Sequence, residues 1–177
     1  MKAIMISIKP QCVEKILNGE KTIEIRKTMP KCELPCKVYI YCTKGKKLYK
    51  CVSNFDEDLL NGKVVAEFTL NKVDILERHL NDWLPKNRYD ISNELLKNIN
   101  LNQEQLWNYG QGKTLYAWHI DDLKIYDEPK LLQVFFKPCG DCDKKDTDRC
   151  IYEDSYCRAK VIRLPQNWCY VEELEDE

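Results

Sequence analysis

The start of this chain is organised around residues 19–26, GEKTIEIR. The leading glycine is predicted to end a helix, because glycine readily adopts the left-handed conformation of a C-terminal cap. The residues after it alternate as in a strand, which puts Ile23 and Ile25 on one face and Glu24 and Arg26 on the other. We therefore expect a strand that packs its isoleucines into a core and points its charged groups outward. The alternative is a solvated edge strand that carries a surface ion pair.

The residues before this stretch predict a strand followed by a short helix. Isoleucines alternate with other residues within residues 3–8, as in a strand with one buried face. Pro10 suits the first turn of a helix, and Val13, Ile16 and Leu17 follow it as an apolar stripe at helical spacing. The first 26 residues are thus predicted to form a strand, helix, strand unit.

Later segments add strands and helices without a regular alternation. Strands are expected at residues 37–42, 63–70, 115–120, 131–136 and 168–171. Residues 73–109 have a helical pattern, for which Asn102 is the expected N-cap and Gly110 the expected end. At least six strands with two or three short helices indicate an α+β protein, a mixed β-barrel with the helices packed outside it. An open α+β sheet is the alternative.

Composition and charge limit the class of protein. Hydrophobic residues make up 44% of the chain, and no apolar run approaches the roughly 20 residues of a membrane span. The N-terminus lacks the features of a signal peptide, so we expect a cytoplasmic protein. The net charge is −1, but residues 1–50 hold 12 Lys or Arg against 4 Glu. This basic segment suits a surface that faces phosphate, and a merely solvated face is the alternative.

Two N-terminal motifs, ISIKP at residues 6–10 and KILNGEKTIEIR at residues 15–26, resemble the signature of the ASCH domain family within the PUA-like superfamily. Later segments agree with it, namely GKVVAEF at 62–68, YAWHI at 116–120 and IYDEP at 125–129. The resemblance implies a PUA-like β-barrel formed by residues 1–136 plus 161–177, with residues 137–160 as a cysteine-rich insertion. It also implies a cleft lined by the strand of residues 19–26 that binds RNA or a modified nucleotide.

The resemblance leaves the question of enzyme activity open between binding and hydrolysis. Small bacterial members of the family are amidohydrolases that deacetylate acetylated cytidine with a lysine, a threonine and a glutamate, and other members act as ribonucleases. Lys21 falls on the lysine position, whereas Glu24 stands at the threonine position. An RNA-binding or nucleotide-binding protein is the leading hypothesis, and a hydrolase, amidohydrolase or ribonuclease, is the alternative.

Residue chemistry assigns roles within this cleft. Lys21 and Glu24 are the candidate catalytic residues, because a lysine can act as nucleophile or base and a glutamate as general base toward water. The candidate residues for binding RNA or substrate are Ser7, Lys9, Arg26, Tyr41 and Glu67. An arginine can direct two donors at a phosphate, and a tyrosine at position 39 or 41 can stack on a base. His119, in a strand beside a tryptophan, is interpreted as structural.

Four of the ten cysteines form a cluster near the C-terminus. Cys139 and Cys142 make a Cys-x-x-Cys pair, and Cys150 and Cys157 follow it. Four thiolates at such spacing can surround a tetrahedral zinc ion, and a reducing compartment disfavours disulfides. We therefore expect a structural zinc that organises this polar segment, with four free thiols in a loop as the alternative. A zinc-stabilised protein-interaction module is a third hypothesis for function.

Overall fold

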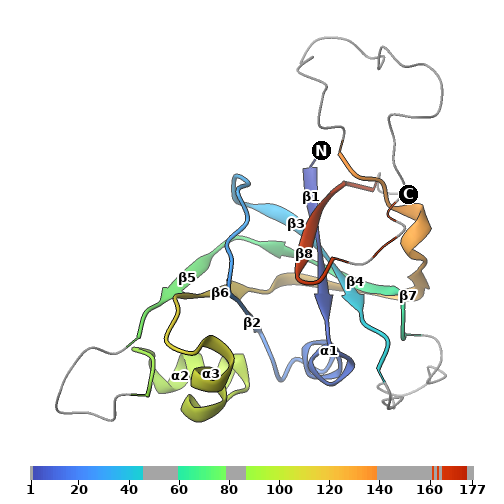
Figure 1. Cartoon of the computed structure of the whole chain (residues 1–177). Coiled ribbons are helices and arrows are strands. Elements are labelled where there is room, and N and C mark those ends of the chain that lie inside the picture. The colour runs from blue at the N-terminus through green and yellow to red at the C-terminus, as the bar shows by residue number, and fades with distance from the viewer. Residues whose placement is uncertain are drawn as a thin grey trace.

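A computed structural model describes residues 2–45, 60–78, 87–138, 161, 163 and 165–174. Within these residues the strands form two sheets, one of five strands in the order β7-β4-β3-β1-β8 and one of three in the order β2-β6-β5 (Figure 1). The elements in chain order are β1 (Lys2–Ile8), α1 (Pro10–Leu17), β2 (Ile23–Arg26), β3 (Cys36–Cys42), β4 (Val64–Leu70), β5 (Val73–Leu76), α2 (Asn93–Ile99), α3 (Gln103–Gly110), β6 (Leu115–His119), β7 (Asp121–Lys130), the 3₁₀ helix η1 (Leu132–Val134) and β8 (Trp168–Glu172).

The five-stranded sheet has β1 near one end, buried on both faces. β1 pairs in parallel with β3 and antiparallel with β8. Its isoleucines enter a core with α1 and β3, whereas Ala3 and Met5 enter a second core with Tyr39 and Phe135. Because successive side chains of a strand point to opposite faces, this one strand supplies both cores.

The three-stranded sheet lies between the first core and two helices. Ile23 and Ile25 pack with α2 and α3 in a third core, and Figure 1 shows both helices beside this sheet. β2 pairs antiparallel with β6, which places Glu24 opposite Trp118. Trp118 belongs to the core of the five-stranded sheet, so the face that carries Glu24 and Arg26 is turned toward that larger sheet.

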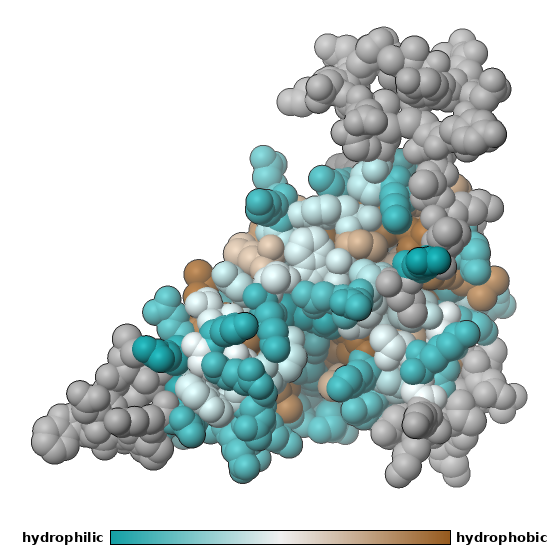
Figure 2. All heavy atoms as spheres, viewed as in Figure 1, coloured by the Kyte–Doolittle hydropathy of each residue, from teal (hydrophilic) through white to brown (hydrophobic). Residues whose placement is uncertain are grey.

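Side-chain caps fix where α2 and α3 begin. Asn102 accepts a hydrogen bond from the Gln105 amide, and the Gln105 side chain accepts one from the Asn102 amide, which completes a capping box for α3. Ser92 caps α2 through a single hydrogen bond, which its hydroxyl accepts from the Leu95 amide. None of the helices within the described ranges is long and apolar enough to cross a membrane. Figure 2 shows mainly hydrophilic side chains on the viewed face, with small separate hydrophobic patches.

The α+β class and the opening strand, helix, strand unit are confirmed, and three later predictions are corrected. The described strands form two sheets that do not close into a single barrel. Residues 132–134 form a 3₁₀ helix where the alternation predicted a strand. Residues 73–76 form β5 by pairing with β6, although the surrounding pattern is helical. β7 was not predicted, because it is an edge strand with Tyr126 as its one buried residue and so shows little hydrophobic alternation.

A close contact fixes the end of α3 against the third core. Tyr89 is fully buried, and its hydroxyl donates a 2.7 Å hydrogen bond to the Lys113 carbonyl. Gly110, the last residue of α3, leaves the space for this hydroxyl, because a Cβ there would lie 1.8 Å from Tyr89 Oη and 2.8 Å from Leu115 Cδ1. The glycine is therefore required by close packing.

We expect Gly110→Ala to lower the free energy of unfolding by about 2–3 kcal/mol, because the added methyl group overpacks a buried site. Urea denaturation measures the change. Gly19→Ala is the matched control: Gly19 has φ of +74° and open space around its Cβ position. Its cost is backbone strain alone, about 1 kcal/mol. Equal losses in the two variants would contradict the packing account.

Candidate functional site

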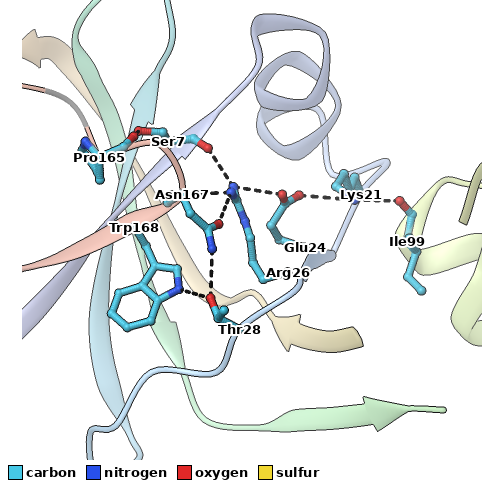
Figure 3. A network of polar contacts seen from close by, with 9 residues as sticks. All are labelled: Ser7, Lys21, Glu24, Arg26, Thr28, Ile99, Pro165, Asn167 and Trp168. Carbon is cyan, nitrogen blue, oxygen red and sulfur yellow. Dashed lines mark hydrogen bonds and ion pairs between the residues drawn. The ribbon is translucent and has the colours of Figure 1, made fainter. Parts of the chain in front are cut away.

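Arg26, the last residue of β2, connects the two sheets (Figure 3). Its Nη2 atom donates a 2.8 Å hydrogen bond to the Ser7 carbonyl at the end of β1. Its Nη1 atom donates a 2.8 Å bond to Asn167 Oδ1 and a longer one, 3.4 Å, to the Asn167 carbonyl. One guanidinium therefore joins the smaller sheet to two neighbouring parts of the larger one.

Glu24 lies between two cations, Arg26 on the same strand and Lys21 just before that strand. Its Oε1 atom is 3.1 Å from Arg26 Nη2, and its Oε2 atom is 3.4 Å from Lys21 Nζ. The side chains of Lys21, Glu24 and Arg26 are only 5%, 11% and 8% exposed. Lys21 also donates a 2.7 Å hydrogen bond to the Ile99 carbonyl at the end of α2. The charged face of this strand is therefore buried and internally paired, whereas the sequence predicted that it would point outward.

Two residues continue the network toward β8. Thr28 Oγ1 accepts hydrogen bonds from Asn167 Nδ2 and from Trp168 Nε1, both at 2.9 Å. The Asn167 side chain thus accepts from Arg26 and donates to Thr28, as Figure 3 shows. No sequence pattern points to Asn167, because it lies 141 residues from Arg26 in a segment without a motif.

Two buried donors at this site have no acceptor among the described residues. They are Arg26 Nε and Trp118 Nε1. Trp118 is fully buried, and it lies directly opposite Glu24 and diagonal to Arg26 on the same face of the β2–β6 pair. A buried unpaired donor typically costs about 1–3 kcal/mol. Two N–H groups of the site are therefore buried without an acceptor among the residues that the structure describes.

Tyr109 of α3 adds an aromatic surface beside the charged residues. It is 38% exposed, and Lys27 Nζ lies 4.8 Å from the centre of its ring. Burial of its hydroxyl raises the pKa of Tyr109, the nearby Arg26 charge lowers it, and Glu24 raises it again. This tyrosine thus lies within electrostatic reach of the paired charges. Sequence reasoning missed it, because nothing in the helical pattern distinguishes it from other surface tyrosines.

Several charged side chains influence the pKa of Cys12 in α1. Burial raises the pKa of its thiol, and the Glu24 carboxylate raises it further. The positive charges of Lys21, Lys15 and Lys9 act in the opposite direction. Lys9 is exposed and forms the N-cap of α1, and its charge acts on the same thiol as Lys21 and Glu24.

The structure brings together four of the seven cleft residues predicted from the sequence. Lys21, Glu24 and Arg26 are in direct contact, and Ser7 contributes its backbone carbonyl. The Ser7 hydroxyl instead donates to the Pro165 carbonyl at 2.8 Å. Lys9 is exposed at the N-cap of α1.

Tyr41 and Glu67 are separated from this site by the five-stranded sheet. Tyr41 is buried in the second core with Tyr39, on the face of β3 turned away from Arg26. Glu67 lies opposite Tyr39 in the β3–β4 pair and accepts a 2.5 Å hydrogen bond from the Tyr126 hydroxyl. Both side chains point to the opposite face of the sheet, because their positions alternate along β3 and β4 with residues of the first core.

The other predicted features lie elsewhere. His119 pairs with Asp74 at 2.7 Å, and Lys72 contacts the second oxygen of that carboxylate at 2.8 Å. Burial would raise the pKa of Asp74, but the hydrogen bonds from Lys72 and His119 lower it below its usual value. Cys139, Cys142, Cys150 and Cys157 lie outside the described residues, as does most of the insertion predicted for residues 137–160, so the zinc ion stays a prediction.

Comparison with known proteins identifies the fold. No protein-family model matches the chain, and no curated protein matches it. The ASCH protein from Zymomonas mobilis is 18% identical over 73% of each chain, with a TM-score of 0.50. A point mutant of the same protein is also 18% identical, covers 75% of this chain and 77% of its own, and has a TM-score of 0.49. The chain therefore has the fold of an ASCH protein, as the N-terminal motifs predicted.

We expect Glu24→Gln to lower the free energy of unfolding by about 3 kcal/mol or more, because it leaves two buried cations without a counter-charge. Urea denaturation at neutral pH measures the loss. Glu20→Gln is the matched control: Glu20 is an exposed carboxylate in the same stretch, and its removal should have little effect. A loss no larger than in the control would show that Glu24 does not hold the two cations together.

Proposed function

We propose that this protein binds a nucleotide or a modified nucleoside, free or within RNA, at the Arg26 site, defined as Lys21, Glu24, Arg26, Trp118 and Tyr109. The observation that carries the proposal is a pair of buried donors, Arg26 Nε and Trp118 Nε1, for which the described part of the chain supplies no acceptor. A base carbonyl or ring nitrogen is an acceptor that such donors bind. The resemblance to the ASCH family supports the same class of ligand.

The charges favour contact with the base at this position over contact with a phosphate. Both terminal nitrogens of Arg26 already bind protein oxygens, so a phosphate would have to displace the Ser7 carbonyl, Asn167 or Glu24. Glu24 also places a negative charge beside the guanidinium. A neutral acceptor needs only the free Nε group and meets no repulsion from the carboxylate.

The surroundings supply the other contacts that a nucleotide needs. Tyr109 presents a partly exposed ring on which a base can stack, and stacking of this kind contributes about 1–3 kcal/mol per base. Exposed Lys9 and Lys27 lie around the site and can contact phosphate groups as point charges. The roles are thus divided: the interior binds the base and the rim attracts the phosphates.

Hydrolysis of an amide on a modified nucleoside is the second candidate function. The contact of Lys21 Nζ with Glu24 Oε2 at 3.4 Å favours it, because the pair joins an amine to a carboxylate in a buried place. Glu24 can act as general base toward a water molecule, and the two free donors can polarise a carbonyl. The candidate catalytic residues remain Lys21 and Glu24.

A panel of nucleosides, nucleotides and short single-stranded RNAs tests both candidates by calorimetry for binding and by chromatography for products. We expect Tyr109→Leu to weaken binding of the best ligand roughly tenfold, because it removes a stacking surface. Ile125→Ala is the control for a change of an exposed apolar residue: it lies on β7, at the opposite edge of the larger sheet from β8.

Unchanged affinity in Tyr109→Leu would contradict the assignment of the Arg26 site, and no binding by any member of the panel would contradict the function. A product that appears with wild type and disappears in Lys21→Met supports hydrolysis over binding alone. Lys124→Met, a change of an exposed lysine on β7 at the far edge of the larger sheet, controls for loss of positive charge.

A further inference from the structure

Two cysteines lie side by side where the loop after β2 enters β3. Cys32 Sγ and Cys36 Sγ are 3.2 Å apart, and both are free thiols. Cys36 is buried at the start of β3, whereas Cys32 is half-buried in the loop and packs against the first core. A disulfide bond needs the two sulfurs at about 2.05 Å, so a small movement of the more exposed side chain would join them.

Neighbouring contacts keep Cys32 in this position. The Lys31 amide donates a 2.7 Å hydrogen bond to the Tyr170 hydroxyl of β8. Tyr170 in turn packs edge-on against Trp168, whose indole donates to Thr28 at the other end of the loop. The loop is therefore held against β8 at two points, and Cys32 lies between the second point and β3.

We propose that Cys32 and Cys36 form a reversible dithiol–disulfide pair that a peroxide oxidises. Such a pair needs one thiol that an oxidant can reach and a second, shielded thiol beside it. Cys32 is open enough for a small oxidant to reach, and Cys36 is shielded beside it. Burial and the hydrogen bond with Cys32 raise the pKa of Cys36 to about 12, so Cys36 stays protonated while Cys32 reacts first.

The reaction balances in two steps. The Cys32 thiolate attacks one oxygen of the peroxide, the O–O bond breaks, and the sulfur becomes a sulfenic acid while hydroxide or alkoxide leaves. Cys36 sulfur then attacks Cys32 sulfur, and its proton leaves with the hydroxyl group as water. Two thiols are oxidised by two electrons, the peroxide is reduced by two, and a dithiol reductant restores the pair.

Oxidation would tie the loop to β3 next to the Arg26 site. The same loop carries Thr28, which binds the Asn167 side chain that accepts from Arg26. A disulfide bond between residues 32 and 36 would reduce the mobility of the loop at its β3 end, whereas Thr28 holds its β2 end. This inference does not depend on the nature of the ligand at the Arg26 site.

The chain is suited to a direct test, because trypsin cleavage after Lys31 and Lys37 releases both thiols in one peptide, CELPCK. The native protein is treated with hydrogen peroxide, the remaining thiols are alkylated under denaturing conditions, and the digest is analysed by mass spectrometry. We expect this peptide to lose two hydrogen atoms and to carry no alkyl group, and a dithiol reductant to restore double alkylation. Cys12 and Cys169, neither of which has a thiol partner among the described residues, are internal controls that should stay alkylated.

A second variant keeps the test independent of folding effects. In Cys36→Ser, Cys32 should accumulate as a sulfenic acid that dimedone traps, because its partner is absent. A CELPCK peptide that stays doubly alkylated at peroxide levels that oxidise Cys12 or Cys169 would overturn the proposal. Protection that a metal chelator removes and a reductant does not would also overturn it, since the pair would then hold a metal ion.

Discussion

The contact of Arg26 with the Ser7 carbonyl is the constraint on which the arrangement of the two sheets depends. β2 and β1 belong to different sheets, and this buried guanidinium joins them at 2.8 Å. Glu24 neutralises the charge, Asn167 fixes the plane of the guanidinium, and Lys21 extends the pairing to the end of α2. A buried arginine is costly to desolvate, so each of these partners is needed for the structure to tolerate it.

The same pairing underlies the proposal that the site contacts a base and not a phosphate. The structure uses the strong, forked donors of Arg26 for its own assembly, and within the described ranges Nε and the indole of Trp118 have no acceptor. Arg26, which the sequence predicted as a phosphate ligand, is thus mainly a connection between the sheets. In that proposal, the Nε–H group is the Arg26 donor that remains for a ligand.

Local sequence patterns predicted the parts of the fold that local patterns determine. The alternation around Ile23, the proline at the start of α1 and the cap at Asn102 each predicted an element correctly. β5 and β7 could not be predicted in this way, because their pairing partners, and not their own patterns, make them strands. The site followed the same rule: local alternation placed Glu24 and Arg26 on one face of β2 but predicted that this face would point outward. Asn167, Trp118 and Tyr109 come from distant segments that only the folded chain brings together.

The central claim is that Arg26 and Trp118 keep donors free for a ligand acceptor, and the indole N–H signals in a ¹⁵N–¹H NMR spectrum test it directly. Trp168 is an internal reference, because its Nε1 already donates to Thr28 at 2.9 Å. When the nucleoside that binds best is added, the Trp118 indole signal, assigned with Trp118→Phe, should move downfield while the Trp168 signal stays in place. A Trp118 signal that does not move at saturating ligand would contradict the account.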